Sequence, residues 1–331
     1  MEIGGVAIEP GQKKIIDLNI GRLYDFTELT LPVQVIRGKK SGPTLFISGA
    51  VHGDELTGVS IVKRVTNHKR LAKLSGTLIA IPIVNVYGFN TRSRYLPDRR
   101  DLNRCFPGSK KGSLASQIAS LFMTEIVKKS DYGIDFHSGA IHRSNLPQIR
   151  TALDEDTNRK LAQAFGVPVI LDAKLRDGSL RAAAAENGVK MLLFEGGEAL
   201  RIDEKIVKSG VNGTLAVMEE ISMLPPQNHS LETATYVATS SYWVRAPQSG
   251  MTKIRKRLGS KVTPGTVLGV ISDEFGSNKC QVKAPSEGII IGQLNLPLVN
   301  KGDAMFHIAT FENSETVREL AADLNDYSEY M

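Results

Sequence analysis

The chain has 331 residues, of which 41% are hydrophobic and 23% are charged, an ordinary composition for a globular protein with room for about two domains. Its formal net charge is +6, but the basic residues are spread out and lack the interleaved aromatic residues of a single-strand binder, which argues against nucleic-acid binding. No apolar run approaches a membrane span, and the first residues lack the features of a signal peptide. We therefore expect a cytoplasmic protein without a membrane or nucleic-acid partner.

Apolar strands alternate with helical stretches over most of the chain, which predicts an α/β sheet flanked by helices. The predicted strands are 44–48, 77–84, 132–136, 167–171 and 189–194, and the predicted helices are 55–65, 116–129, 159–165, 180–186 and 202–223. Ser179 is expected to cap the helix 180–186, and Gly188 to end it. The Pro-rich segment that starts at Pro225 breaks the last helix, so we predict one domain over 1–228 and another over 229–331.

His52 and Glu55 lie on the turn that leaves the strand 44–48, and His137 closes the strand 132–136. A lone His-x-x-Glu is often only a solvated helix start. The placement at strand ends, where open α/β sheets bind ligands, favours a metal site. The three side chains would hold one zinc ion and leave a fourth position open for water. Asp135 shares the face of His137 and is expected either to hydrogen-bond the metal ligand or to be a buried structural group.

Glu195 follows the apolar strand 189–194 and precedes two glycines. A carboxylate at the end of a buried strand is costly unless it is paired or functional. A zinc hydrolase also needs a carboxylate that moves protons between water and the leaving amine. We therefore predict that Glu195 is the general base, with its neighbour Glu198 as the alternative.

The segment 92–104 contains five arginines without a helical or strand period. Arg binds a carboxylate through two parallel hydrogen bonds, so the segment predicts a loop that lines an anion site. A solvated basic loop is the alternative, above all for Arg92, Arg99 and Arg100. The chemistry of the sequence alone does not rank the five.

Five short motifs occur in a fixed order over these segments: His52-x-x-Glu55, Arg94-Tyr95, Asp101-Leu102-Asn103-Arg104, Asp135-Phe136-His137 and Phe194-Glu195. In that order they resemble the succinylglutamate desuccinylase/aspartoacylase family, a branch of the zinc carboxypeptidase-like fold, over about residues 40 to 225. The resemblance implies that His52, Glu55 and His137 hold zinc and that Glu195 is the general base and later the acid. It also implies that Asn103 and Arg104 hold the carboxylate of the substrate, and that Arg94 polarises the scissile carbonyl and stabilises the oxyanion.

The spacer between Arg94 and Asn103 is longer here than in the family pattern, because residues 97–100 extend it. Arg100 is therefore an alternative to Arg94. The departure also indicates a related deacylase rather than either enzyme that gives the family its name.

Beyond Ser230 the sequence consists of short β-rich segments, with no long helix until about Glu315. The segment 244–250 recurs as 282–288, and 262–265 is echoed by 299–302. Two such halves predict a small β-barrel or sandwich with pseudo-twofold symmetry, and this part resembles the biotinyl/lipoyl carrier fold. The predicted hairpin tip carries Gly276 and Ser277 where a carrier has its modified lysine, so we expect no attached cofactor, even on the nearby Lys279.

These predictions combine into a zinc-dependent deacylase that hydrolyses the amide bond of a small, acidic N-acylated amino acid or related amine, with one Zn²⁺ per chain. A carboxypeptidase acting on peptides is an alternative. A non-enzymatic metal-binding or carrier protein is an alternative of another class. The acyl group, the amine and the docking of the C-terminal domain are left open, and the sequence allows a homo-oligomer without predicting one.

Overall fold

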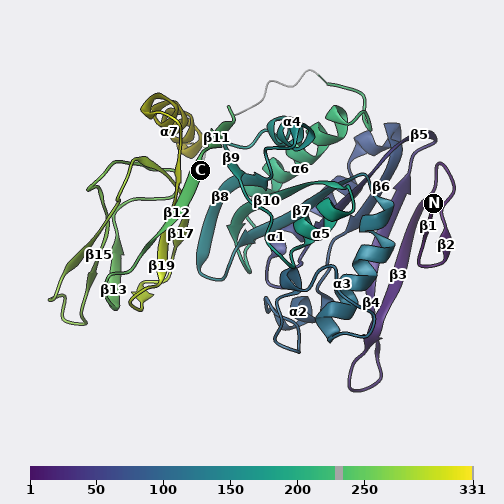
Figure 1. Cartoon of the computed structure of the whole chain (residues 1–331), viewed down its shortest axis with the longest axis horizontal. Coiled ribbons are helices and arrows are strands. Elements are labelled where there is room, and N and C mark those ends of the chain that lie inside the picture. The colour runs from purple at the N-terminus through teal and green to yellow at the C-terminus, as the bar shows by residue number, and fades with distance from the viewer. Residues whose placement is uncertain (228–233, 330–331) are drawn as a thin grey trace.

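The computed structural model describes residues 1–227 and 234–329, and its main feature is one large mixed sheet that runs through the molecule. The sheet has 13 strands, ten of them in the order β12-β19-β17-β8-β10-β7-β5-β6-β4-β3. Figure 1 shows the N-terminal strands at one end of the molecule and the C-terminal strands at the other. The predicted domain boundary after residue 228 lies outside the described residues, and the division into two domains stays a prediction.

Residues 1–198 supply one end and the centre of this sheet. Its strands are β3 (Lys13–Arg22), β4 (Glu28–Arg37), β5 (Lys40–Gly49), β6 (Ser75–Ile81), β7 (Tyr132–Gly139), β8 (Arg143–Thr151), β9 (Val169–Asp172) and β10 (Lys190–Glu198), preceded by the separate hairpin β1 (Glu2–Ile3) and β2 (Val6–Ala7). β6, β5, β7 and β10 are parallel neighbours, whereas β8 and β4 run antiparallel to them. The alternation of strands and helices thus forms a parallel centre with antiparallel flanks.

Helices cover both faces of the sheet. They are α1 (Leu56–Thr66), α2 (Val86–Thr91), α3 (Leu114–Glu125), α4 (Asp156–Phe165), α5 (Leu180–Glu186), α6 (Glu204–Glu220) and α7 (Ser314–Glu329), with short 3-10 helices at Lys69–Lys73, Leu102–Arg104 and Val127–Lys129. Apolar residues of α1, α4 and α6 pack on one face, and those of α3 and α5 pack on the other. The strands between them are buried on both sides, which explains their nearly continuous apolar sequences.

The α5 helix starts and ends as its sequence predicts. It spans Leu180–Glu186, the hydroxyl of Ser179 accepts a hydrogen bond from the backbone N–H of Ala182, and Gly188 has a φ of 76°. A left-handed residue just after a helix is ordinary for glycine and costly for other residues. Local chemistry alone therefore sets the limits of this helix.

The sheet differs from the prediction in several places, and the first is that β3 and β4 are absent from the predicted strands. The strand predicted to end at Phe194 continues to Glu198 through a bulge after Glu195. β8, which lies beside it, is absent from the predicted strands. Its sequence contains Pro147 and many polar residues, because part of it faces the polar site, so it lacks the apolar alternation of an ordinary strand.

The C-terminal part extends the main sheet and adds a second one. β11 (Tyr236–Ala238), β12 (Ser240–Arg245), β14 (Lys261–Val262), β17 (Gly288–Leu294) and β19 (Ala304–Thr310) belong to the main sheet, while β13 (Gly250–Ile254), β15 (Val267–Ser272), β16 (Cys280–Lys283) and β18 (Leu298–Val299) form a separate sheet. A shared apolar core joins strands of the two sheets. The chain therefore builds two packed β layers here, as the short strands predict. The likeness to the biotinyl/lipoyl fold stays a prediction.

The internal repeat has a structural counterpart. The N–H of Gly265 donates to the carbonyl of Ala284 at 2.9 Å, and the N–H of Gly302 donates to the carbonyl of Ala246 at 2.8 Å. These four residues hold matching places in the two halves of the repeat. The halves thus exchange equivalent hydrogen bonds, as expected for a pseudo-twofold arrangement.

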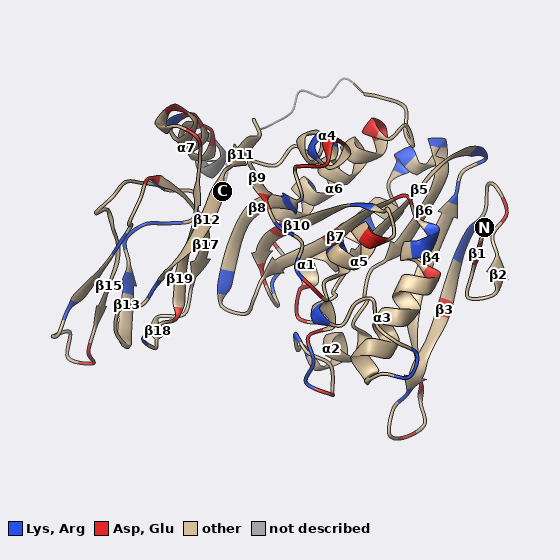
Figure 2. Ribbon diagram, in the orientation of Figure 1, with Lys and Arg blue, Asp and Glu red and all other residues tan. Residues whose placement is uncertain are grey.

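Basic and acidic residues are interspersed over the elements of both sheets (Figure 2), so the net charge of +6 is not gathered on one element. Among the described residues, no helix is both long and apolar enough to cross a membrane.

Candidate metal centre

The strands that carry the predicted metal ligands and base lie next to one another. β5, β7 and β10 are adjacent and parallel, so their carboxyl ends open at the same edge of the sheet. His52 and Glu55 follow β5, His137 lies near the end of β7, and the Cα of Glu195 on β10 pairs with that of His137. The strand order therefore gathers four residues from three distant segments.

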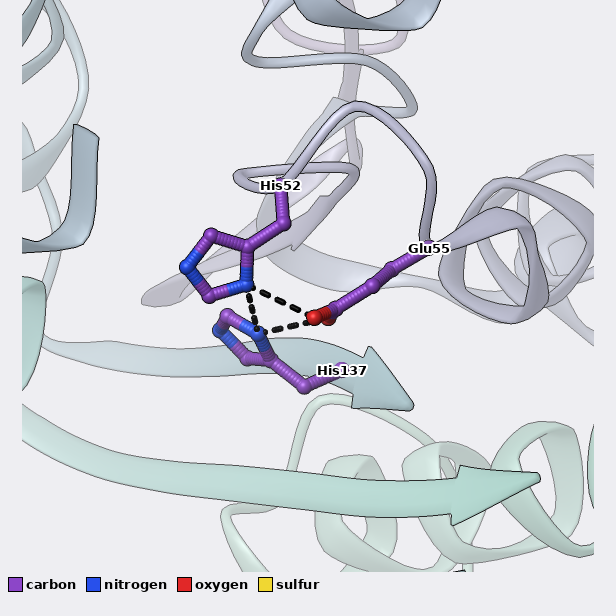
Figure 3. A group of neighbouring side chains, drawn as sticks. All are labelled: His52, Glu55 and His137. Atoms are coloured by element: carbon purple, nitrogen blue, oxygen red, sulfur yellow. Dashed lines mark hydrogen bonds and ion pairs between the residues drawn. The ribbon is translucent and has the colours of Figure 1, made fainter. Parts of the chain in front are cut away.

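The turn between His52 and Glu55 is held close to α2. A Cβ atom on Gly53 would lie 2.0 Å from the carbonyl carbon of Gly88, so only glycine allows this approach. Glu55 occupies the N-cap position of α1, but its side chain makes no capping hydrogen bond. The carboxylate turns instead toward the two histidines (Figure 3).

The side chains of His52, Glu55 and His137 converge, and each offers a possible metal-binding atom. The Nδ1 atom of His52 lies 2.8 Å from Oε1 of Glu55, the Nδ1 atom of His137 lies 2.8 Å from Oε2, and the two Nδ1 atoms are 3.2 Å apart. The three side chains are buried, and their ligand atoms all lie within 4.8 Å of one another. Figure 3 shows both rings and the carboxylate directed at a common centre.

The Nε2 atom of each imidazole, on the side of the ring opposite Glu55, contacts a carboxylate. Nε2 of His52 lies 3.0 Å from Oδ1 of Asp101, and Nε2 of His137 lies 2.7 Å from Oδ2 of Asp135. Because a carboxylate only accepts hydrogen bonds, Asp101 and Asp135 keep a proton on each Nε2, so that the Nδ1 lone pair of each ring faces the centre once the ring is neutral. Two nitrogen lone pairs beside a carboxylate are a donor set for a divalent metal ion, and a carboxylate behind each histidine is typical of such sites. The residues therefore fit a metal ion.

Asp135 holds the first of its two predicted roles, that of a hydrogen-bonding partner for the histidine. It is fully buried, and its other oxygen accepts a hydrogen bond from the hydroxyl of Ser48 at 2.7 Å. Asp101, which holds His52, comes from the arginine-rich loop, and its position cannot be read from spacing. It also accepts a hydrogen bond from the backbone N–H of Asn103 at 2.9 Å.

The electrostatics of the centre also favour a cation. Burial tends to lower the pKa of His137, but Asp135 and Glu55 outweigh it and raise this pKa well above its ordinary value. Burial also tends to lower the pKa of His52, but Glu55 and Asp101 outweigh it and raise this pKa. Burial tends to raise the pKa of Glu55, but the two histidines hold it well below its ordinary range. The carboxylates thus create a negative potential that attracts positive charge, whether protons or a metal ion.

Glu195 lies beside this centre, and its carboxylate is held by β8. Its Oε2 atom accepts a hydrogen bond of 2.8 Å from the side-chain amide of Asn145, and its Oε1 atom lies 3.9 Å from Nε of Arg150. The side chain is 16% exposed. The alternative residue, Glu198, accepts hydrogen bonds from Ser144 and Asn295 instead.

The two arginines proposed for the carbonyl lie in different places. Arg94 donates from Nη1 to Glu55 at 3.2 Å and from Nη2 to Asp101 at 3.0 Å. Arg100 is exposed and lies next to Asp98, with 3.8 Å between Nε and Oδ2. The structure therefore places Arg94, and not Arg100, against the candidate metal ligand Glu55.

Asn103 and Arg104 follow Asp101 in a short 3-10 turn. The side-chain oxygen of Asn103 accepts the backbone N–H of Leu180 at 2.9 Å, which joins the loop to the start of α5. Arg104 is exposed and donates from Nη1 to the carbonyl of Asn103. Burial and the nearby Arg176 and Arg94, opposed by Asp101, lower the pKa of Arg104.

Further arginines lie near Glu195 that the sequence does not single out. The pKa of Arg181 is lowered to about 10 by burial and by Arg150 and Arg176, against the opposing effect of Glu195. Cations that lie close together form a positive region suited to an anionic ligand. Arg150 lies on the unpredicted β8, and nothing local marks Arg176 or Arg181, so only the structure brings this group together.

Several known proteins are similar to this chain. The profile of the succinylglutamate desuccinylase/aspartoacylase catalytic domain matches residues 41–221, more than half of the chain. An N-alpha-acetyl-L-2,4-diaminobutyric acid deacetylase from Halomonas elongata is 29% identical over 302 residues, which are 84% of this chain and 85% of the relative.

Solved structures share the fold over nearly the full length. The product-bound ectoine utilization protein EutE (DoeB) from Ruegeria pomeroyi superposes with a TM-score of 0.83 at 23% identity, covering 92% of this chain and 97% of the other. A succinylglutamate desuccinylase/aspartoacylase from Rhodobacter sphaeroides gives a TM-score of 0.80 at 23% identity, with coverage of 91% and 95%. With the profile spanning all the motifs named above, the chain belongs to the succinylglutamate desuccinylase/aspartoacylase family.

Proposed function

We propose that the protein is a zinc-dependent deacylase that hydrolyses the amide bond of a small N-acylated amino acid. The observation that carries the proposal is the convergence of His52, Glu55 and His137 beside Glu195. The family and the N-acetyl-diaminobutyrate deacetylase relative support the reaction class.

Zinc is the metal that best suits the donor set. Two imidazole nitrogens and one carboxylate oxygen are typical ligands of catalytic zinc, which keeps one position open. A bound zinc ion supplies a Lewis acid for the amide carbonyl and makes water acidic enough to lose a proton near neutral pH. His52, Glu55 and His137 would hold it, with Asp101 and Asp135 fixing the ring orientations.

Glu195 moves the protons of the reaction. Its carboxylate accepts a proton from the water that attacks the amide carbon, and delivers that proton to the nitrogen as the C–N bond breaks. The new C–O bond yields a free carboxylic acid, and the nitrogen leaves as an amine. Oε1 is the oxygen available for this transfer, because Oε2 is engaged by Asn145.

Arg94 stabilises the oxygen that becomes negative during the attack. Its guanidinium lies against Glu55 and Asp101 and is thus fixed at the metal ligands. A donor that is already oriented stabilises a developing oxyanion without reorganisation at the moment of reaction. Arg100 is exposed beside Asp98 and, among the described residues, has no contact of this kind, so the role belongs to Arg94.

Asn103 and Arg104 hold the carboxylate of the substrate. Arg104 is exposed, whereas the amide oxygen of Asn103 is bound to α5, so its NH₂ group is the part that serves a substrate oxygen. The surrounding Arg150, Arg176 and Arg181 add positive potential. This charge pattern favours an acidic amino acid over a basic one such as diaminobutyrate.

The test combines metal analysis with a substrate panel. The wild type and the His137→Ala variant are analysed for bound metal and incubated with N-acetyl-L-aspartate, N-succinyl-L-glutamate, Nα-acetyl-L-2,4-diaminobutyrate and a short peptide. We expect near-stoichiometric zinc and free amino acid from the wild type, and loss of both in the variant. A wild type without metal would overturn the mechanism. Release of C-terminal residues from the peptide alone would favour the carboxypeptidase alternative.

A further inference from the structure

The seam between the two parts of the main sheet lies directly beside Glu195. β8 pairs on one side with β10, which carries Glu195, and on the other side with β17 from the C-terminal part. Asn145 is one of three β8 residues that pair with β17 at this seam, and its Cα pairs with that of Gly292. Its side-chain amide also donates the 2.8 Å hydrogen bond to Oε2 of Glu195. One buried residue thus touches both the candidate base and the C-terminal strand.

Gly292 leaves room for this side chain. A Cβ atom at Gly292 would lie 3.0 Å from the amide oxygen of Asn145 and 3.0 Å from Cβ of His307. His307 lies on the next strand, β19, and stacks on Trp243 of β12 with ring centroids 4.6 Å apart. Because the stack on Trp243 limits the movement of His307, a larger residue at position 292 would push against Asn145.

We propose that Asn145 is a positioning residue for Glu195, and that Gly292 of the C-terminal strand β17 keeps the Asn145 amide in place. The proposal rests on the proposed role of Glu195 as the general base. The C-terminal strands thereby take part in catalysis without touching the substrate.

The geometry explains why Glu195 needs such a partner. Within residues 1–227 and 234–329, the side chain of Glu195 has a hydrogen bond from Asn145 and an ion-pair contact with Arg150, both on β8. The distance of 3.9 Å from Oε1 to Nε of Arg150 is too long for a hydrogen bond. The hydrogen bond from Asn145 is therefore the contact that fixes the torsion of the carboxylate. It occupies Oε2 and leaves Oε1 to accept the proton of a water molecule.

The first test replaces Asn145 with a residue of similar shape that cannot donate. Asn145→Leu is expected to lower kcat by about tenfold, with KM, bound zinc and Tm close to those of the wild type. The matched control is Asn295→Leu, because Asn295 donates a hydrogen bond of 2.9 Å to Glu198 across the same seam. The control is expected to keep kcat within about twofold. Equal losses in both variants would assign the effect to the seam as a whole and overturn the proposal.

A double-mutant cycle separates a positioning role from a structural one. In the Glu195→Gln background, Asn145→Leu is expected to cause no further loss of kcat, since both changes act on the same proton transfer. Additive losses would overturn the proposal. Normal activity of the Glu195→Gln variant would instead overturn the role of Glu195 as the base. This outcome differs from additive losses, so failure of the proposed function and failure of the positioning role can be told apart.

Two more variants test the direction of the effect. Asn145→Asp places a second carboxylate beside Glu195, while Arg150, Arg181, His137 and Glu198 are unchanged around it. The acid limb of the pH dependence of kcat is expected to move up by about one pH unit, a change that loss of packing would not produce. Gly292→Ala is expected to lower kcat like Asn145→Leu, and to add nothing to it when the two are combined.

A crystal structure gives a readout that does not depend on the substrate. The carboxylate of Glu195 is expected to rotate or to show two conformers in Asn145→Leu, and to stay single in Asn295→Leu. An unmoved, well-ordered Glu195 in Asn145→Leu would overturn the proposal whatever the enzyme acts on.

Discussion

The Nδ1 atoms of His52 and His137 lie 3.2 Å apart, while carboxylates hold both Nε2 atoms. Two neutral imidazoles in this arrangement turn their lone pairs toward each other and toward Glu55, which is unfavourable unless a cation lies between them. The same carboxylates that raise the pKa of His137 therefore prepare the site for a metal ion, and protons compete with that ion as the pH falls.

Asp135 is predicted to control metal affinity through His137. Asp135→Asn keeps the shape but weakens the hold on Nε2 of His137, so the affinity for zinc is expected to fall by about 10- to 100-fold. Competition with a coloured chelator measures this change. Asp131→Asn is the matched control, because Asp131 accepts a hydrogen bond from the backbone of Thr44 near the start of the same strand. Equal losses in both variants would point to damage of the strand rather than of the site.

Glu195 is predicted to be required for turnover and not for metal binding. Glu195→Gln keeps the size of the side chain but removes the proton acceptor, so kcat is expected to fall by at least about a hundredfold with zinc retained. Glu198→Gln, the comparison variant, is expected to remain close to the wild type in steady-state kinetics. A loss confined to Glu198→Gln would transfer the role to that residue.

Substitutions of Arg94 and of Arg100 are predicted to have very different effects on kcat. Arg94→Lys cannot bridge Glu55 and Asp101 with a planar fork, so kcat is expected to drop by about a hundredfold. Arg100→Lys is expected to have almost no effect, because Arg100 is exposed beside Asp98. Kinetics of the two variants on the best substrate of the panel test this, and the opposite order would restore Arg100 as the residue that stabilises the oxyanion.

His307 is predicted to make the protein less stable in mild acid. Burial and Arg150 lower its pKa to about 3 in the folded protein, whereas a histidine in the unfolded chain has a pKa of about 6.5. Between these values the unfolded chain binds more protons, so stability is lost as the pH falls below the unfolded value. The loss is expected to be about 2 kcal/mol at pH ~5.

The measurement compares the free energy of unfolding in urea at neutral pH and in mild acid for the wild type and His307→Phe. Phenylalanine retains the stacking on Trp243 but does not titrate, and both proteins share the same metal site, whose own pH dependence cancels. The decrease on acidification is expected to be smaller in the variant. An identical decrease in both proteins would mean that the folded protein accommodates a protonated His307.

The candidate metal ligands could be predicted from the sequence because they are recognised by their spacing and by the strands that precede them. His52 and Glu55 share one turn, and His137 closes an apolar strand. The caps of α5 are equally local, and the helix has the predicted limits. Such features follow from spacing and backbone chemistry within a few residues.

The neighbours of these residues depended on pairing between distant strands. Asp101 reaches His52 across the sheet edge, and Asn145 reaches Glu195 only because β8 lies beside β10. β8 itself has no apolar alternation, so neither the strand nor its contacts could be predicted from one sequence. Whether Arg94 or Arg100 lies at the site likewise depends on the conformation of the loop 92–104, which the sequence does not give.

The sequence by itself thus determined the family, the α/β alternation and the order of the candidate metal-binding motifs, since these depend on local patterns along the chain. Only the tertiary structure decided which carboxylate holds each histidine, which arginine meets the ligands, and that Gly292 of the C-terminal part packs against Asn145. The physical reason is that hydrogen bonds and close packing act over a few ångströms in space, and strand order sets which distant residues come within that range.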